Sequence, residues 1–202
     1  MRPSEHIQCV DFPCQDIERA RYTVPGIDLD PASMRILMVA EAPPPDAADD
    51  FYAMGEPFYL QTTLQAFKQA GVNVSSMQEL LDKGVYITTA IKCGKTGYGV
   101  ATQTVKNCSP LLEQELALFP NLRAILLMGD VAIKAMNDIA KRQSGKRLFR
   151  SGPTYKIRES EYIHRGVRVF PTYLQTGKSF LIEKSKQVMI ADDIRAALGL
   201  AG

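Results

Sequence analysis

Residues 35–64, RILMVAEAPPPDAADDFYAMGEPFYLQTTL, decide the fold. The segment opens with an apolar run that stops abruptly at EAPPP, and an acidic tract follows. The tract leads into GEPF and then into an amphipathic helix that begins near Leu60. A buried strand that ends in such a loop places the loop at the carboxyl edge of a parallel sheet, where open α/β proteins bind their ligands. This loop is therefore the candidate active site.

The rest of the chain alternates between strands and helices. Apolar or β-branched runs predict four strands, at residues 35–40, 85–90, 124–128 and 167–173, the last preceded by a hairpin-like segment. Helical spacing predicts helices at 60–70, 105–119, 131–140 and 180–198, and a short helix capped by Ser75 or Ser76. The alternation predicts a three-layer α/β/α sandwich with a central four-stranded parallel sheet. We expect one domain over residues 1–202, with residues 1–34 irregular because prolines interrupt them.

Composition and charge narrow the functional class. The 202 residues are 46% hydrophobic and 23% charged, which is typical of a soluble globular protein. The net charge is only +2, so nucleic-acid binding would depend on a local basic patch. No apolar run approaches the roughly 18–20 residues of a membrane span, and the N-terminus is too polar for a secretory signal. We expect a cytoplasmic protein with no membrane association, and a monomer.

Four cysteines form two pairs, Cys9 with Cys14 and Cys93 with Cys108. Without an export signal these thiols should be reduced, so disulfides are not expected. Four thiolates suit a metal or cluster site. The four residues between Cys9 and Cys14 make a looser pair than the common spacing of two. Buried, unligated cysteines are therefore the alternative.

Five segments, in order, resemble the uracil-DNA glycosylase superfamily, in particular its iron–sulfur, family 4-like branch. AEAPP at 40–44 stands where that branch has GEAPG, and GEPFYL at 55–60 matches its G-x-P-F-V-G segment. YITTAIKC at 86–93 follows the pattern Y-I-T-N-x-x-K-C, and CSP at 108–110 matches C-x-P. PTYLQT at 171–176 stands where the branch has P-T-x-H-P-S. The resemblance covers nearly the whole chain and implies the three-layer fold and a DNA partner.

The resemblance also assigns roles to individual residues. It implies a structural 4Fe–4S cluster held by Cys9, Cys14, Cys93 and Cys108, with structural zinc or no metal as the alternatives. Such a cluster would tie the irregular N-terminus to the loop after the second strand. The base would be bound by Ala42, Phe58, Thr89 and Leu174, with Phe58 as the stacking aromatic.

Departures from the family pattern concentrate at the residues that define uracil chemistry. Thr89 replaces the Asn that reads uracil, and its hydroxyl cannot reproduce the two-pronged amide contact. Leu174 replaces the His that stabilises the leaving base, and it has nothing to donate. A positioned donor to a developing anion is typically worth roughly 10²–10³ in rate. Ordinary uracil excision is therefore doubtful.

Two interpretations follow, with a weak uracil-DNA glycosylase as a third. In the first, the pocket has been reshaped for a modified or non-uracil base, and Glu41 or Asp46 places or activates the attacking water. In the second, the fold has lost catalysis and binds DNA or a protein. In either case phosphates would be met by Lys146, Arg147 and Arg150. The loop that replaces the family's duplex wedge would contact DNA through Gln175, Thr176 and Lys178.

Overall fold

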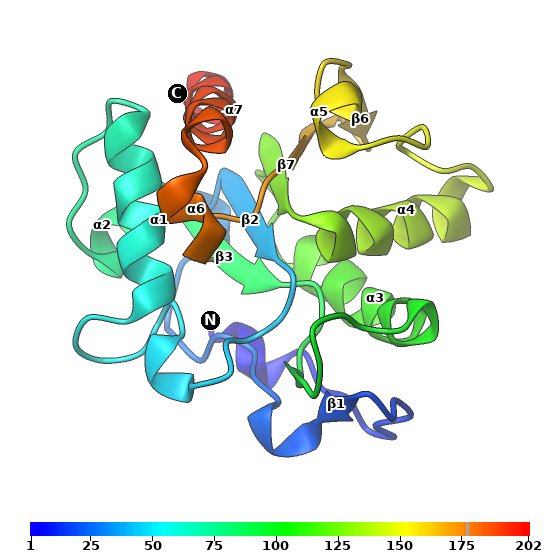
Figure 1. Ribbon diagram of the computed structural model, residues 1–202. Helices are drawn as coiled ribbons and strands as arrows, with labels where there is room; N and C mark the ends of the chain where they lie inside the picture. Colours follow the sequence, from blue (N-terminus) through cyan, green and yellow to red (C-terminus); the bar gives the residue numbers. More distant parts are fainter. Residues whose placement is uncertain (177) are drawn as a thin grey trace.

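The computed structural model describes residues 1–176 and 178–202, and for Lys178 and Ser179 the backbone alone. Its central sheet has the strand order β3-β2-β5-β7-β6 (Figure 1). Four of these strands run parallel, namely β2 (Ile36–Ala40), β3 (Val85–Thr89), β5 (Ala124–Met128) and β7 (Val167–Thr172). Residues of β2, β3 and β5 are buried without exception, which agrees with their continuous apolar sequences.

The sheet has five strands in the described chain, so the prediction of four was one too few. The fifth, β6 (Tyr162–His164), pairs antiparallel with β7 at the edge of the sheet. Arg165 and Gly166 join the two strands and both have positive φ, at 50° and 83°. Two such residues make the tight turn whose twist suits a hairpin. The hairpin-like segment was thus recognised from the sequence, but not its contribution to the sheet.

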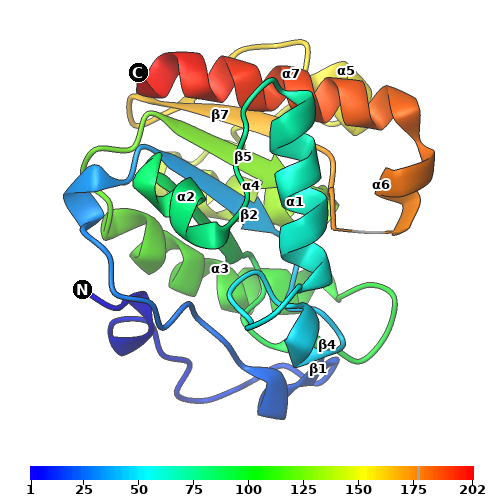
Figure 2. The ribbon, with the colours of Figure 1, turned by 90° about the vertical axis from the view of Figure 1, so that its left-hand side faces the viewer.

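Helices cover both faces of the sheet, as Figures 1 and 2 show. One core contains side chains of α1 (Phe58–Gln69), α2 (Met77–Asp82) and α7 (Lys184–Ala201). The other contains side chains of α3 (Thr102–Ala117), α4 (Asp130–Ser144) and the N-terminal segment. The three-layer prediction is confirmed. Among the described residues, no helix combines the length and apolarity that crossing a bilayer requires.

Two helices differ from prediction. α3 begins three residues before the helix expected at 105–119, and Pro110 lies inside it. A proline cannot donate to the carbonyl four residues earlier, and here the Ser109 hydroxyl donates to that carbonyl, on Lys106, at 3.1 Å. The single helix expected over 180–198 is divided into α6 (Lys178–Ile182) and α7, with Glu183 non-helical between them.

The N-terminal segment packs against the α3 side of the sheet and contains short elements only. Three 3₁₀ turns, at Pro3–Glu5, Arg19–Arg21 and Pro31–Ser33, accompany β1 (Ile17–Glu18). β1 pairs with β4 (Gly94–Lys95), which belongs to the loop after β3. The remaining short elements are the 3₁₀ turn Ala47–Asp49 and α5 (Thr154–Ile157). The β1–β4 pairing brings the N-terminal segment to the carboxyl edge of the sheet.

Candidate functional site

The loop after β2 folds back over the outer edge of β3. Tyr52 fixes it there, because its hydroxyl donates to the carbonyl oxygen of Ile87 at 2.8 Å and accepts from the Ile87 amide at 3.1 Å. β3 is an edge strand, so one tyrosine satisfies both backbone groups that no neighbouring strand reaches. The preceding residue, Phe51, is buried in the α1 side of the core. These two anchors hold the loop directly after its acidic tract.

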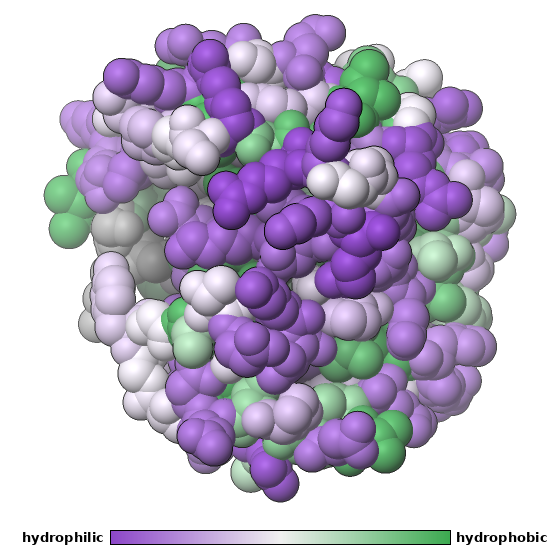
Figure 3. Space-filling model, turned by 90° about the vertical axis from the view of Figure 1, so that its right-hand side faces the viewer, coloured by the Kyte–Doolittle hydropathy of each residue, from purple (hydrophilic) through white to green (hydrophobic). Residues whose placement is uncertain are grey.

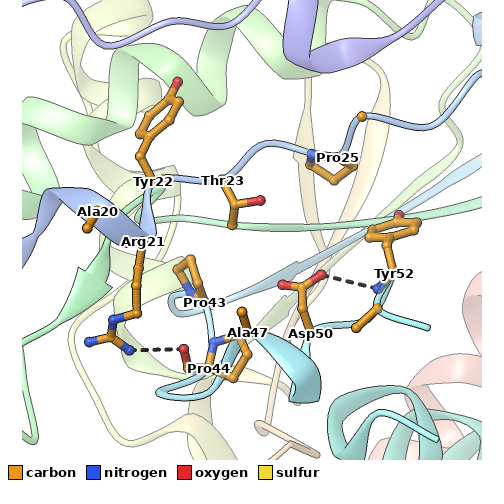
Figure 4. Close-up of a pocket in the computed structure, with 12 residues that line it drawn as sticks. Ala20, Arg21, Tyr22, Thr23, Pro25, Pro43, Pro44, Ala47, Asp50 and Tyr52 are labelled. Carbon is orange, nitrogen blue, oxygen red and sulfur yellow. Dashed lines mark hydrogen bonds between the residues drawn. The ribbon is translucent and has the colours of Figure 1, made fainter. Parts of the chain in front are cut away.

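A cavity of about 410 Å³ separates this loop from the N-terminal segment (Figure 4). The residues with polar side chains on its wall are Arg21, Tyr22, Thr23, Asp50 and Tyr52, and much of the remainder is proline and alanine. Figure 4 shows the Asp50 side chain extending from the loop toward the segment that carries Thr23 and Pro25. Its Oδ1 atom accepts from the Tyr52 amide at 3.1 Å. Burial raises the pKa of Asp50 above its ordinary range.

A smaller cavity, of about 10 Å³, joins the same region to the end of β3. It shares Thr23, Pro25, Asp50 and Tyr52 with the large cavity and adds Thr88 and Thr89. Thr89 is buried at the carboxyl end of its strand. The position that the resemblance identifies as the base reader therefore lines the same small cavity as Asp50.

Arg21 connects three segments around the large cavity. Its guanidinium donates to the Glu18 carboxylate at 2.7 Å, to the carbonyl oxygen of Pro44 at 3.0 Å and to that of Lys95 at 2.8 Å. Gly94 packs so closely against it that an added Cβ would lie 2.4 Å from the guanidinium carbon. Arg21 thus holds the N-terminal wall against the loops after β2 and β3.

Glu41 lies where α4 begins. Its carboxylate is 3.4 Å from the Val131 amide and 3.4 Å from the Lys95 ammonium. Both groups complement its negative charge, the amide through the positive end of the helix. Gly129 is required beside it, because φ is +99° there and a Cβ would lie 2.7 Å from Glu41 Oε1. The Glu41 side chain keeps 19% of its surface exposed, so a carboxylate oxygen can still meet water.

Comparison of the sequence with known proteins identifies the family. The family model described as the Uracil DNA glycosylase superfamily matches residues 27–185. The chain is a member of the uracil-DNA glycosylase superfamily. Its sequence is also 25% identical over 95 residues to a protein of Thermus thermophilus described as a Type-5 uracil-DNA glycosylase. That match covers 47% of this chain and 43% of the relative, so the chain matches less than half of the relative's length.

The four cysteines of this superfamily member line one apolar cavity of about 20 Å³ between the N-terminal segment and α3. Burial, together with the charges of the other three cysteines, raises the pKa of Cys93 to about 12. Two sulfur atoms accept hydrogen bonds, Cys14 from the Asn107 amide at 3.6 Å and Cys108 from the Lys92 backbone at 3.3 Å. Convergent thiols with N–H donors suit an iron–sulfur cluster. In the described part of the chain, no three Cys, His, Asp or Glu side chains are already grouped for a single metal ion.

Phe58, the expected stacking residue, opens α1 and is half-buried. Ala42 is buried in the core on the α3 side, and Leu174 packs partly against the opposite core. Asp46 is exposed, and its side chain accepts from the Ala48 amide at 2.9 Å to cap a 3₁₀ turn. It does not line the two cavities that contain Asp50. The same is true of Glu41, Ala42, Phe58 and Leu174, so of the expected catalytic and base-binding residues the structure brings only Thr89 to these cavities.

Two of the expected DNA contacts are wrong for this conformation. Gln175 is 0% exposed and its amide donates to the Thr63 hydroxyl at 3.4 Å, while Thr176 is 3% exposed. Side chains so deeply buried cannot touch DNA unless the loop rearranges. The side chain of Lys178 lies outside the described residues.

The basic loop lies at the opposite edge of the sheet from the cavities. α4 begins at the carboxyl end of β5 and runs back, so that Lys146, Arg147 and Arg150 follow it to the amino edge. There Lys146 and Arg147 line a surface hollow with His164 and Arg165, of the β6–β7 hairpin. Figure 3 shows the predominantly hydrophilic face on which these elements lie. The structure therefore does not bring the basic loop together with the base-binding candidates.

Sequence reasoning missed Arg21, Thr23, Asp50 and Tyr52 as individual site residues. Asp50 belongs to the acidic tract that was recognised, but the sequence of the tract does not show which of its carboxylates lines the cavity. Arg21 and Thr23 lie outside the five family-like segments. No sequence signal indicated that the N-terminal segment would form one wall of the cavity.

Proposed function

We propose that the protein is a DNA glycosylase that hydrolyses the N-glycosidic bond of a flipped-out base other than uracil. The observation that carries this proposal is the cavity at the carboxyl edge, which contains the Asp50 carboxylate and adjoins Thr89. Its size falls in the range of pockets that enclose a small organic ligand, roughly 300–1,000 Å³. A member of this superfamily that has Thr89 and Leu174 in place of Asn and His lacks the donors that uracil excision uses.

The reaction needs a water placed beside the sugar and a base held outside the helix. We assign the water to Glu41, whose carboxylate is held in place by Lys95 and the start of α4. Water attacks the anomeric carbon, a C–O bond forms, and the C–N bond to the base breaks. The electron pair leaves with the base, which then takes up a proton, while Glu41 accepts a proton from the water. Phe58 is assigned to stack on the extruded base.

We further propose that the four cysteines hold a 4Fe–4S cluster with a structural role. A bound cluster would fix Cys9 and Cys14, on the N-terminal segment, to Cys93 and Cys108. The same segment supplies Arg21 and Thr23 to the cavity wall, so the cluster would support the pocket from behind. Purified protein should be brown, with a visible charge-transfer band and iron and sulfide in equal amounts. Stoichiometric zinc without iron would refute this assignment.

The activity is tested with duplex and single-stranded DNA that contains one modified base, followed by alkali to cleave abasic sites. The panel includes uracil, hypoxanthine, and modified cytosines and adenines. We expect strand cleavage with a modified base and little with uracil. Preferred cleavage at uracil would contradict the proposal and identify the protein as a uracil-DNA glycosylase. No product from any base, with salt-sensitive DNA binding intact, would favour a glycosylase fold that has become a DNA-binding module.

A further inference from the structure

Asp50 is the acidic residue that the large and the small cavity share. Its Oδ1 atom is engaged by the Tyr52 amide, and Oδ2 has no hydrogen-bond partner among the described residues. The carboxylate has no ion pair in the described part of the chain, although the Arg21 guanidinium faces the same cavity. A half-buried carboxylate on a cavity wall, with one oxygen that no protein group engages, is an acceptor that a ligand's donor can meet.

The identity of the donor follows from the chemistry of base edges. An ionised carboxylate is acceptor-only, so it attracts an N–H group and repels a carbonyl oxygen. Cytosine and adenine carry an exocyclic amine, and Asp or Glu is a common partner of the cytosine amine. Uracil, thymine and hypoxanthine carry a carbonyl oxygen at the equivalent position. Thr89 borders the same small cavity, and its single hydroxyl can donate or accept beside the carboxylate.

We propose that Asp50 is a specificity-determining residue and that the substrate base bears an exocyclic amine, as a cytosine or adenine derivative does. This inference rests on the proposed glycosylase function and names its substrate class. The large cavity then encloses the base with its substituent, between the polar wall of Arg21 and Thr23 and the apolar wall of Pro43, Pro44 and Ala47.

Burial supports this role. Asp50 is half-buried on the cavity wall, and a site built to receive an amine discriminates strongly against an analogue that lacks it. The charged or titratable groups that lie near Asp50 are Arg21 from the N-terminal segment, Asp49 and Tyr52 from its own loop, and Tyr59 from α1.

The test uses pairs of bases that differ only in amine against carbonyl. Hydroxymethylcytosine is compared with hydroxymethyluracil, and adenine with hypoxanthine, each in the same duplex. Wild-type protein should excise the amine member at least about 100-fold faster, as expected for a site with a dedicated hydrogen bond. Asp50→Asn presents an amide that can turn its NH₂ group toward a carbonyl, so the preference should fall by at least about 100-fold or reverse.

Controls separate this inference from the proposed function. Asp82→Asn removes an exposed carboxylate from α2 and should leave the preference unchanged. Thermal unfolding verifies that Asp50→Asn is folded, and Asp50→Ser provides a second variant without the carboxylate. If abasic sites form but wild type favours the carbonyl member, or if the Asp50 variants keep the wild-type ratio, the inference is wrong and the glycosylase function stands. If wild type produces no abasic sites with any base, both fail.

Discussion

The ammonium group of Lys92 forms an ion pair with the carboxylate of Glu115, and neither side chain is exposed to solvent. The same ammonium donates to the Thr88 hydroxyl at 2.8 Å and to the Thr89 carbonyl oxygen at 2.6 Å. The backbone amide of Lys92 donates to the Cys108 sulfur. One residue therefore links the end of β3, helix α3 and the cysteine cavity, directly beneath the proposed base reader.

Lys92→Met should lower the free energy of unfolding by about 3–5 kcal/mol, because it leaves the Glu115 carboxylate buried without its cation. The double variant Lys92→Met/Glu115→Gln removes both charges and should recover part of this loss. Urea unfolding followed by circular dichroism measures both. An equal cost for the single and the double variant would show that the ion pair is not the source of the effect.

Arg21→Lys should raise KM for excision while the protein stays folded. A lysine keeps the charge but cannot reach Glu18, Pro44 and Lys95 with one planar fork, so the N-terminal wall of the cavity loosens. Gly94→Ala should act similarly, since its methyl group would displace the guanidinium. Arg19→Lys, on the neighbouring exposed residue, is the matched control. Wild-type kinetics in both Arg21→Lys and Gly94→Ala would show that Arg21 does not shape the substrate site.

Glu41→Gln should reduce the excision rate by at least about tenfold, since an amide cannot accept the proton from water. The change keeps the shape of the side chain beside Gly129, so binding of DNA should change little. Single-turnover cleavage gives the rate, and fluorescence anisotropy gives the affinity. Undiminished turnover would mean that another group activates the water.

The parts of the fold that were predicted are those in which one physical cause dominates. β2, β3, β5 and β7 are continuous apolar or β-branched runs because most of their residues are buried. β6 was not predicted because it has only three residues, too few for a recognisable pattern. It forms a strand because the tight turn after it pairs it with β7. The division of the last helix was equally hidden, since the apolar spacing continues through Glu183.

The candidate site was predictable as a place but not as a set of side chains. Glu41 was recognised because it belongs to the family-like segment AEAPP, which ends the first buried strand. Asp46 and Asp50 cannot be distinguished from the sequence, because both belong to one acidic tract. They differ in the folded protein. Asp50 lies two residues before Tyr52, whose hydroxyl bonds to the Ile87 backbone, and it lines the cavity. Asp46 caps a surface turn. Such a long-range anchor leaves no periodic signal in the sequence.

Asp50→Asn should be more stable than wild type at neutral pH and equally stable in acid. The pKa of Asp50 is raised by burial, so the folded state binds its proton more tightly than the unfolded state does. Ionisation therefore costs stability as the pH rises from the ordinary aspartate value to the raised one, and the full cost remains above that range. Asparagine never ionises and can still accept from the Tyr52 amide. Thermal unfolding across this pH range measures the difference, and a gap that does not change with pH would contradict this explanation.

Arg147→Ala should weaken binding to every DNA sequence and lower the slope of log affinity against log salt, by up to about one unit for one lost phosphate contact. The excision rate at saturating DNA should not change, because the basic loop lies at the opposite edge of the sheet from the cavities. Lys68→Ala removes one exposed positive charge from α1 and is the control. Equal salt slopes for Arg147→Ala and Lys68→Ala would identify the basic loop as a solvated surface. DNA contacts would then have to come from the carboxyl edge alone, where Arg21 and Lys95 already lie beside the cavity and Glu41.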